Sequence, residues 1–452
     1  LGCGLFTNQI ILSDFMEEHQ INIRMFRPME SYQKYGGVLT FARSVGYAVV
    51  KKPEGYTTAK VDQIIQEYEK KSANEQQSTA KQYPNIITVV NETFADIKVL
   101  GDFKTNEDYM PYFHSLKKNC VTGYTYASIV GGQTANTEFE LLTGNTLGFL
   151  SAGTTAFQLY IHGQMPSLVS NLKAEGYSGN KAMHPFNPYN YNRPAVYKDF
   201  GFTDFIDKFD FPKNVKRVRE YISDEANVDR IISEYEKNRK KTDQPFYMYN
   251  MTIQNHSPYD KDAANFKQPI KIESSKYDAE ANRYLNLIKY SDDSLKQLTS
   301  YFEKCKEPTI ILFLGDHQPR LTDEFMNKIT NGQYQTWSSE QMMKRYQVPF
   351  VIWANYDIKE QHIEKTSMNY IQSILTKTAG VKMTGYQRFL NEVRKEVPTI
   401  TSQGYWGKNG KFYQINDKGS PYYGIIQKYR MIQYNMMFDK KNRRDSFFEV
   451  SK

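Results

Sequence analysis

The sequence has few cysteines, no long hydrophobic run and no concentrated block of one charge. Its three cysteines, Cys3, Cys120 and Cys305, form an odd and sparse set that argues against a disulfide framework. The apolar run near Val38–Val50 is interrupted by Arg43 and is too short to span a bilayer. The sequence also starts without an initiator Met or a signal peptide, so we expect a soluble fragment of a longer precursor.

The charge balance excludes some partners and favours others. The net charge is +8, from 58 Lys and Arg against 50 Asp and Glu, which is mild for 452 residues. No dense basic stripe or nucleic-acid motif is present, so nucleic acid is not an expected partner. The surplus instead favours an anionic membrane surface or a phosphate-bearing substrate. The 35 tyrosines hint at a carbohydrate partner, because their rings stack on sugars and suit wet surfaces.

Four short apolar runs rich in β-branched residues predict strands that are buried on both faces of a sheet. Amphipathic helical stretches lie between them, such as residues 165–177 and 280–305. Strands that alternate with helices predict an α/β fold with a central, mostly parallel sheet flanked by helices. The four runs are residues 85–90, 245–256, 309–315 and 349–355.

We divide the chain into three parts, since 452 residues exceed what one hydrophobic core usually serves. Residues 1–82 are expected to form a helical segment and a linker, which follow a membrane region that is absent here. The clearest helix is predicted at 53–71. Residues 83–395 are expected to form the main α/β domain. Residues 396–452 have Gly and Asn turns between short alternating runs, which predict a small antiparallel β appendage before a final helix.

The most informative stretch is GGQTANTEFELLTG, residues 131–144, which places Thr134 on a glycine-flanked turn. A hydroxyl is a weak nucleophile until a base or a metal lowers its pKa. Glu92 follows one predicted strand, and Asp316 and His317 follow another, at the strand ends where such sheets bind ligands. Each residue alone could be a solvated carboxylate or a helix cap. Together they favour a site for Mn²⁺, Mg²⁺ or Zn²⁺ that activates the threonine.

Two histidines and an arginine in other loops are further candidates for the site. His256 follows the strand run at 245–256, and His184 and Arg193 bracket the segment HPFNPYNYNR. Two imidazoles and a guanidinium suit a phosphate ester, because Arg binds phosphate oxygens as a fork and His donates hydrogen bonds or protons. In such Pro/Asn-rich loops these residues can equally be structural. Glu138 and Glu140, in the first turns after the proposed nucleophile, are assigned a structural role, since carboxylates favour a helix N-terminus.

These motifs resemble the extracellular catalytic domain of the lipoteichoic acid synthase and phosphoglycerol transferase family, within the alkaline phosphatase and sulfatase superfamily. The resemblance runs from about residue 35 to the C-terminus, and so many motifs in one order are a specific signal. They are PEGYT (53–57), NIITVVNETFAD (85–96), MPYFHSL (110–116), GGQTANTEFELLTG (131–144), HPFNPYNYNR (184–193), TIQNHSPY (252–259), LGDHQPRL (314–321) and VPFVIWAN (348–355).

The resemblance implies a sulfatase-like or alkaline-phosphatase-like fold and a metal centre. Glu92, Thr134, Asp316 and His317 match the positions that bind one divalent ion in the family, usually Mn²⁺. Thr134 matches the nucleophile, which attacks the phosphodiester of phosphatidylglycerol and releases diacylglycerol. An acceptor hydroxyl then attacks the phosphoglyceryl-threonine.

The resemblance also implies how substrates bind and where the reaction occurs. His184, Arg193 and His256 match positions that hold the glycerol phosphate, and Tyr191 stands where the family tends to have an aromatic residue near the glycerol. The implied acceptor is a cell-envelope glycopolymer, either lipoteichoic acid or a wall polysaccharide. The implied location is the extracellular face of the membrane of a Gram-positive bacterium, as part of a multi-pass membrane protein.

Two departures from the family pattern affect the acceptor. Synthases that polymerise lipoteichoic acid often have Lys before the nucleophile, whereas this chain has Gln133. They also tend to have His two residues before the metal-binding Glu, and here that residue is Val90. The family's chemistry is expected to survive both changes. A protein that decorates a wall polysaccharide is therefore an alternative to a polymerase, and Gln133 is a candidate substrate-binding residue.

Two other functions are compatible with the sequence. The first is another activity of the same superfamily, either a phosphoethanolamine transferase or a sulfatase. A sulfatase needs Cys or Ser near Pro and Arg to form its formylglycine, and residues 131–140 contain none of the four. The second is a non-catalytic wall-binding domain with a Tyr-rich surface. The presence of all four proposed metal residues argues against it.

Overall fold

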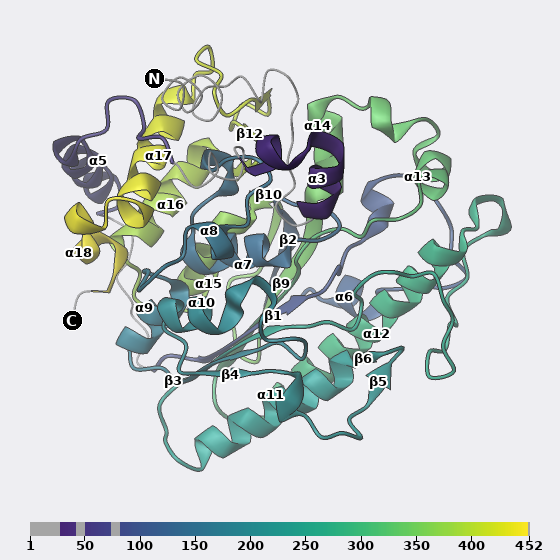
Figure 1. The fold of residues 1–452 in the computed structure, drawn as a ribbon. Helices are drawn as coiled ribbons and strands as arrows, with labels where there is room; N and C mark the ends of the chain where they lie inside the picture. Colours follow the sequence, from purple (N-terminus) through teal and green to yellow (C-terminus); the bar gives the residue numbers. More distant parts are fainter. Residues whose placement is uncertain (1–27, 42–49, 74–81, 451–452) are drawn as a thin grey trace.

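The centre of the computed structural model is a sheet of eight strands, which runs through the middle of the molecule in Figure 1. The structure describes residues 28–41, 50–73 and 82–450. Within these residues the strand order is β10-β2-β9-β8-β1-β7-β3-β4, and β9 alone runs against the rest of this sheet. The predicted mostly parallel sheet is confirmed. Its strands are β1 (Asn85–Asn91), β2 (Cys120–Tyr126), β3 (Ser178–Met183), β4 (Asp204–Ile206), β7 (Phe246–Met251), β8 (Thr309–Gly315), β9 (Gln347–Ala354) and β10 (Gln361–Ser367).

Three neighbouring strands in the middle of the sheet, β8, β1 and β7, are buried along their whole length. Burial on both faces requires a layer of helices on each side, as their continuous apolar runs indicated. The run predicted at 309–315 coincides with β8, whereas the run predicted at 245–256 is longer than β7. The residues after Met251 leave the sheet and form the loop that carries His256.

Helices cover both faces of the sheet (Figure 1). On one side α15 packs against α7, β2 and β10, while α9 and α10 pack against β3 and β4. On the other side α11 packs against β3 and β7, and α12 packs against β8, α11 and α6. The helices around the sheet are α6 (Pro111–Ser115), α7 (Thr134–Thr143), α8 (Ala156–Leu159), α9 (Leu168–Ala174), α10 (Arg193–Phe200), α11 (Asp224–Arg239), α12 (Ala279–Phe302), α13 (Asp323–Thr330), α14 (Ser339–Met342) and α15 (Met368–Thr378).

Helices from the two ends of the chain pack together, with α5 against α16 and α17 (Figure 1). Helix α5 begins where Thr57 accepts a hydrogen bond from the Lys60 N–H, a cap that stabilises a helix by about 1 kcal/mol. Arg444 Nε and Nη2 donate to both carboxylate oxygens of Asp62 on α5, at 2.6 and 2.8 Å. These outer helices are α3 (Pro28–Tyr35), α5 (Thr58–Lys71), α16 (Gly385–Glu396), α17 (Tyr423–Met437) and α18 (Asp445–Phe448).

The predicted C-terminal appendage is confirmed as a small antiparallel sheet that packs beside β10. A separate two-stranded hairpin, β5–β6, lies between β4 and α11 in the chain. The domain boundaries at 82 and 395 stay a prediction, and most of the predicted linker, residues 74–81, lies outside the described residues. The short strands are β5 (Arg217–Val218), β6 (Tyr221–Ile222), β11 (Thr399–Thr401), β12 (Gly404–Trp406) and β13 (Phe412–Tyr413).

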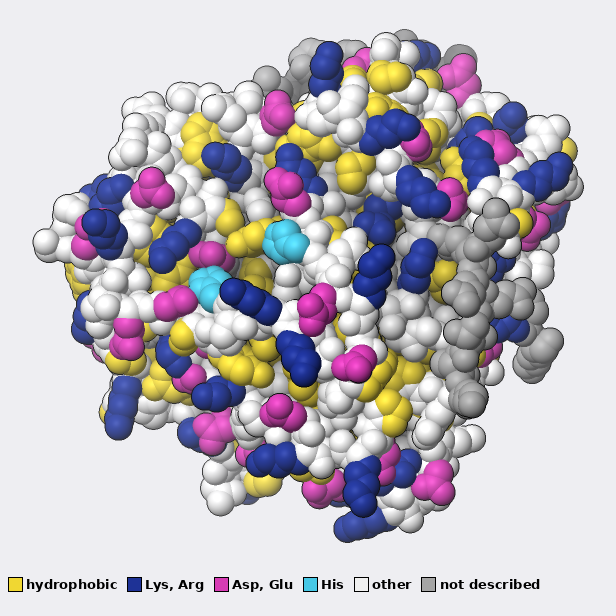
Figure 2. Space-filling model, turned by 180° about the vertical axis from the view of Figure 1, so that it is seen from behind, with side chains coloured by type: hydrophobic (Ala, Val, Ile, Leu, Met, Phe, Trp, Pro, Cys, Tyr) yellow, Lys and Arg dark blue, Asp and Glu magenta, His cyan; other side chains and the backbone are white. Residues whose placement is uncertain are grey.

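The surface carries both charge signs. On the face that Figure 2 shows, Lys and Arg side chains of the described residues are interspersed with Asp and Glu and do not gather in one stripe. None of the described helices is both long enough and apolar enough to cross a membrane. Cys120 and Cys305 are free thiols, and Cys3 lies outside the described residues.

Candidate active site

The carboxyl ends of four parallel strands, β8, β1, β7 and β3, lie side by side at one edge of the sheet. The register places the last residues of β1 and β8 opposite each other, so that Glu92 and Asp316, which follow them, come together. The loops after β7 and β3 bring His256 and His184 to the same edge. This edge is where α/β sheets bind their ligands.

A turn with three successive positive φ angles brings Thr134 to this edge. Gly131 (φ 66°), Gly132 (φ 142°) and Gln133 (φ 66°) precede Thr134, the first residue of α7. A Cβ at Gly131 would also lie 3.0 Å from Arg320 Cβ, a tight contact that favours glycine there. A non-glycine residue such as Gln133 in this conformation is uncommon, and such strain clusters at functional sites. The N-terminus of α7 favours an anion beside Thr134, because its N–H groups and positive dipole end face that point.

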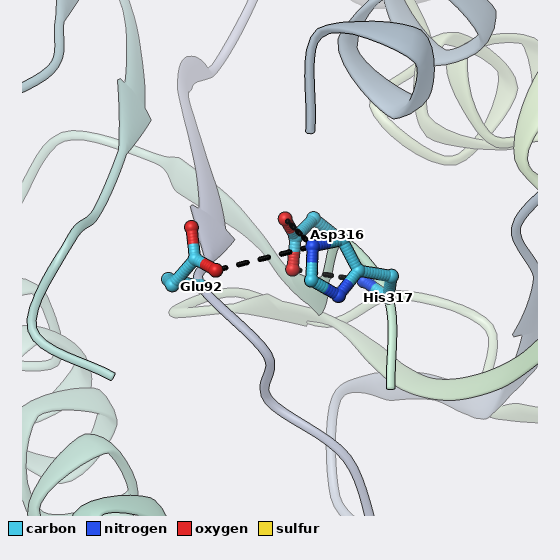
Figure 3. A group of neighbouring side chains, drawn as sticks. All are labelled: Glu92, Asp316 and His317. Atoms are coloured by element: carbon cyan, nitrogen blue, oxygen red, sulfur yellow. Dashed lines mark hydrogen bonds and ion pairs between the residues drawn. The ribbon is translucent and has the colours of Figure 1, made fainter. Parts of the chain in front are cut away.

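Glu92, Asp316 and His317 converge at the strand ends (Figure 3), each with a ligand atom within 4.8 Å of the others. Thr134 Oγ1 donates a hydrogen bond to Asp316 Oδ2 at 2.8 Å. Two backbone N–H groups donate to Asp316 Oδ1, at 2.7 and 2.8 Å, and fix the carboxylate. His317 Nδ1 lies 2.9 Å from the carbonyl oxygen of Gln318 and donates to it, which leaves Nε2 as the ring atom that faces the two carboxylates.

The ligand atoms of Glu92, Asp316 and His317 are suited to bind a divalent cation. His317 Nε2 is buried without a hydrogen-bond partner among the described residues, 3.2 Å from Asp316 Oδ2 and 3.9 Å from Glu92 Oε1. Burial, reinforced by repulsion from Asp316, raises the pKa of Glu92. A cation would relieve that repulsion, and this set of oxygen and nitrogen ligands suits Mn²⁺, Mg²⁺ or Zn²⁺. Bound there, such an ion supplies polarisation of a phosphoryl oxygen and stabilises the alkoxide of Thr134.

A cavity of about 560 Å³ lies over the cluster. His184 and His256 line it, and each holds its Nδ1 against a backbone carbonyl oxygen, at 2.9 and 2.7 Å. Burial lowers the pKa of both imidazoles, and for His184 the neighbouring Arg193 lowers it further. Both rings are therefore neutral and present Nε2 as a hydrogen-bond acceptor, which suits a substrate hydroxyl. The predicted site residues that line the cavity are Glu92, Gln133, Thr134, His184, Tyr191, Arg193, His256 and His317, while Asp316 is fully buried.

Arg193 is held by Glu138, a contact that sequence reasoning missed. Glu138 lies beyond the first turn of α7 and is fully buried. Its Oε1 accepts hydrogen bonds from Arg193 Nε at 3.0 Å and Nη2 at 2.6 Å, and its Oε2 accepts from the hydroxyls of Tyr197 and Tyr249. Burial acts to lower the pKa of Arg193, but attraction to Glu138 outweighs it, so the net pKa is raised. The ring of Tyr191 lies 5.1 Å from the guanidinium carbon of Arg193.

Several other lining residues were not identified from the sequence. Phe186, Tyr189, Tyr259 and Arg320 all line the cavity and fall inside motifs that were recognised, so these motifs contained the signal. Gln158, on the short helix α8, also lines the cavity, but no sequence pattern marks it. The recognised motifs therefore account for most of the cavity wall.

Comparison with known proteins places this site in a family. The family model described as Sulfatase matches residues 84–381, which contain every residue of the site. A Rhizobium meliloti protein named for cyclic beta-1,2-glucan modification is 30% identical over 433 residues, or 94% of this chain and 65% of the relative. The lipoteichoic acid synthase of Staphylococcus aureus is 28% identical over 196 residues, covering 41% of this chain and 28% of the synthase.

Solved structures show the same fold. A phosphoglycerol transferase of Streptococcus pyogenes, in complex with sn-glycerol-1-phosphate, matches with a TM-score of 0.71 at 20% identity, covering 89% of this chain and all of that chain. A lipoteichoic acid synthase of Listeria monocytogenes matches with a TM-score of 0.60 at 19% identity, covering 86% of this chain and 98% of that chain. The chain spans between about a third and two-thirds of the length of the first curated relatives. It belongs to the sulfatase family, and the resemblance to lipoteichoic acid synthases and phosphoglycerol transferases is confirmed.

Proposed function

We propose that this chain transfers glycerol phosphate from phosphatidylglycerol to a cell-envelope glycopolymer through a phosphoglyceryl-threonine intermediate. The observation that carries the proposal is the position of Thr134 at the N-terminus of α7, with Oγ1 2.8 Å from Asp316 Oδ2. The cavity over it also contains Arg193 and two imidazoles that act as acceptors. Transfer of glycerol phosphate from a phosphodiester requires a nucleophile, a guanidinium that binds the phosphate oxygens, and acceptors for the glycerol hydroxyls.

In the proposed first step, Thr134 Oγ1 attacks the phosphorus and the bond from phosphorus to the diacylglycerol oxygen breaks. The Thr134 hydroxyl, which Asp316 Oδ2 orients through a hydrogen bond, gives up its proton to water, and the released diacylglycerol oxygen takes up one proton from water. Arg193 binds the phosphate oxygens, while His184 and His256 accept hydrogen bonds from the glycerol hydroxyls. The result is glycerol phosphate esterified to Thr134.

In the proposed second step, an acceptor hydroxyl attacks the same phosphorus from the cavity and gives up its proton to water. The bond from phosphorus to Thr134 Oγ1 breaks, Thr134 Oγ1 takes up one proton from water, and the glycerol phosphate passes to the acceptor. Glu92, Thr134, Asp316 and His317 would hold one divalent ion during both steps, with Mn²⁺ as the first candidate. Metal identity and the covalent intermediate are both parts of the proposal.

The comparisons support this activity and suggest the kind of acceptor. The matching Streptococcus pyogenes structure is named as a phosphoglycerol transferase and contains sn-glycerol-1-phosphate. The Rhizobium meliloti relative is named for modification of a cyclic glucan. Together with Gln133 and Val90, which depart from the polymerase pattern, that name favours decoration of a polysaccharide. We propose that the domain acts at the outer face of a bacterial membrane, and the Gram-positive setting stays a prediction.

The proposal is tested by the donor step alone. The protein is incubated with Mn²⁺ and vesicles that contain fluorescent phosphatidylglycerol, and labelled diacylglycerol is quantified. We expect release by the wild type and almost none by Thr134→Ala. A parallel arm with fluorescent phosphatidylethanolamine tests the alternative of a phosphoethanolamine transferase. No release from phosphatidylglycerol by the wild type, or equal release by Thr134→Ala, contradicts the proposal.

A further inference from the structure

A second cavity, of about 470 Å³, lies directly beside the catalytic cavity, and Phe186 lines both. Its other walls come from the turn after β4 and from the hairpin β5–β6, which Figure 1 shows beside α11. We call it the side cavity and define it by Phe186, Lys208, Phe209, Lys213, Arg217 and Tyr221. None of the roles proposed above uses these residues.

Three aromatic rings form the partition between the two cavities. The Phe186 ring lies 6.1 Å from the rings of both His256 and Tyr221, and the Tyr221 and His256 rings are 5.7 Å apart. His256 is one of the residues proposed to bind the glycerol of the donor. A chain bound in the side cavity therefore lies one ring away from the transferred group, close enough for its next segment to enter the catalytic cavity.

The side cavity is positively charged. Lys208 and Lys213 are exposed and form no ion pair with any described residue. Arg217 donates through Nη1 to a backbone carbonyl oxygen at 3.0 Å and keeps its charge unpaired among the described residues. Glu220 is the single carboxylate among the described lining residues, so three cations less one carboxylate leave a formal charge of +2. An anionic ligand complements this charge.

The side cavity also presents aromatic surface to solvent. Phe209 is 73% exposed, and Lys208 Nζ lies 4.9 Å from its ring centre. Phe209 lines the side cavity together with Phe186 and Tyr221. The faces of Phe209, Phe186 and Tyr221 offer flat apolar surfaces of the kind on which sugar rings stack. Cations together with aromatic faces point to a ligand that contains both phosphate groups and sugars.

We propose that the side cavity binds the acceptor, a carbohydrate chain that already bears phosphate groups. The sugar rings pack against Phe209 and Phe186, and attached phosphates pair with Lys208, Lys213 and Arg217. The inference rests on the proposed function, since the next free hydroxyl of the chain must reach the phosphoglyceryl-threonine. We choose a glycan over a lipid bilayer because the cations and aromatic rings line a hollow of about 470 Å³ that a single chain can enter, and the vesicle arm of the test below separates the two ligands.

The test separates the donor step from the acceptor step. Diacylglycerol release from fluorescent phosphatidylglycerol, with water as the only acceptor, measures the donor step. Transfer of headgroup-labelled glycerol phosphate measures the acceptor step, with two probes: a β-1,2-glucan oligosaccharide and the same glucan already substituted with glycerol phosphate. Lys216→Gln is the matched charge control, because Lys216 lies in the same segment but pairs with Glu225. Tyr277→Ala is the aromatic control, because Tyr277 is 48% exposed elsewhere.

We expect Phe209→Ala to raise the acceptor KM for both glucans, because both contain sugar rings. The double variant Lys208→Gln/Lys213→Gln is expected to raise KM by about fivefold or more for the substituted glucan alone, at roughly 0.5 kcal/mol for each exposed charge. Neither variant should change diacylglycerol release, and both controls should behave as the wild type. These results would support an acceptor site for an anionic glycan.

Three outcomes overturn the inference while leaving the proposed function intact. The first is a wild-type acceptor KM in every side-cavity variant. The second is no transfer by the wild type to either glucan while diacylglycerol release continues. The third is loss of binding to phosphatidylglycerol vesicles in Phe209→Ala, which would identify a membrane contact instead. Absence of diacylglycerol release by the wild type would instead refute the proposed function itself.

Discussion

The pairing of Glu138 with Arg193 gives the sharpest mutational prediction. Glu138→Gln preserves the size of the side chain and one oxygen acceptor, but it removes the negative charge opposite a guanidinium that is 1% exposed. Two hydrogen bonds from Arg193 end on one carboxylate oxygen of Glu138, and two tyrosine hydroxyls donate to the other. In the variant, an amide N–H₂ group replaces one of these acceptors.

The structure sets the size of the effect. Removal of one partner from a buried ion pair leaves an uncompensated charge and costs about 3–5 kcal/mol. Because Gln keeps an oxygen that Arg193 can still bond, we expect Glu138→Gln to lower the free energy of unfolding by about 3 kcal/mol. The guanidinium also loses its fixed orientation in the cavity. Misplacement of a group that binds the reacting phosphate costs about 10- to 100-fold in kcat/KM for the donor step.

Glu140→Gln is the matched control for this prediction. Glu140 lies on the same helix and is buried, but its Oε1 accepts from Ser128 Oγ, Thr146 Oγ1 and the Leu147 N–H and forms no ion pair with any residue that the structure describes. Burial raises the pKa of Glu140 to about 7, so its carboxyl group is partly protonated at neutral pH. We expect a loss of about 1 kcal/mol and unchanged donor kinetics. Urea unfolding and diacylglycerol release measure both quantities, and equal kinetics in the two variants would refute the positioning role of Glu138.

Three further predictions concern the nucleophile, the metal and pH. Thr134→Ala should lower diacylglycerol release at least about a thousandfold with little change in unfolding free energy; release near the wild-type rate would exclude it as nucleophile. Glu92→Gln should raise the Tm of the metal-free protein, because it relieves repulsion in the cluster, and should abolish the rise in Tm that Mn²⁺ causes; a persisting rise in scanning fluorimetry would argue against the metal site. The pKa of His114 is raised to about 9, chiefly by its hydrogen bond to Asp96 and also by Asp108, against the effect of burial. Protonated His114 therefore contributes fully to the free energy of unfolding below about pH 6.5, and this contribution is lost as pH rises through about 9. The difference in unfolding free energy between wild type and His114→Asn should shrink across that window. A difference that stays constant with pH in urea titrations would contradict this prediction.

The sequence predicted β8, β1 and β7, three of the four strands whose ends carry the site, because these strands are continuous apolar runs. It did not predict β2, β3, β4 or β10, although all four belong to the central sheet. Strand β3 (SGNKAM) and strand β10 (QHIEKTS) lie toward the margins, where partial exposure permits polar residues and removes the apolar pattern. These segments are identified as strands only by their pairing with neighbouring strands, which no local sequence pattern predicts.

The sequence predicted the residues that line the candidate site, but it did not predict the buried contacts that hold those residues in place. The residues of the acidic cluster follow strand ends directly, so their convergence follows from strand order and register. Glu138 was assigned to a helix N-terminus, whereas the structure places it further along α7 against Arg193, which lies 55 residues away in the chain. Such a contact depends on how α7 and α10 pack. The side cavity likewise depends on the packing of a hairpin beside Phe186, and no motif marks it.

The central claim is that glycerol phosphate becomes covalently attached to Thr134. Peptide mass spectrometry of the protein after reaction with its donor lipid tests this claim most directly. The protein is incubated with Mn²⁺ and phosphatidylglycerol labelled in its headgroup, without an acceptor glycan, and is quenched in acid before digestion. The account predicts one labelled glycerol phosphate on the peptide that contains Thr134, and no adduct in Thr134→Ala. Diacylglycerol release without any adduct, or an adduct on another residue, would contradict it.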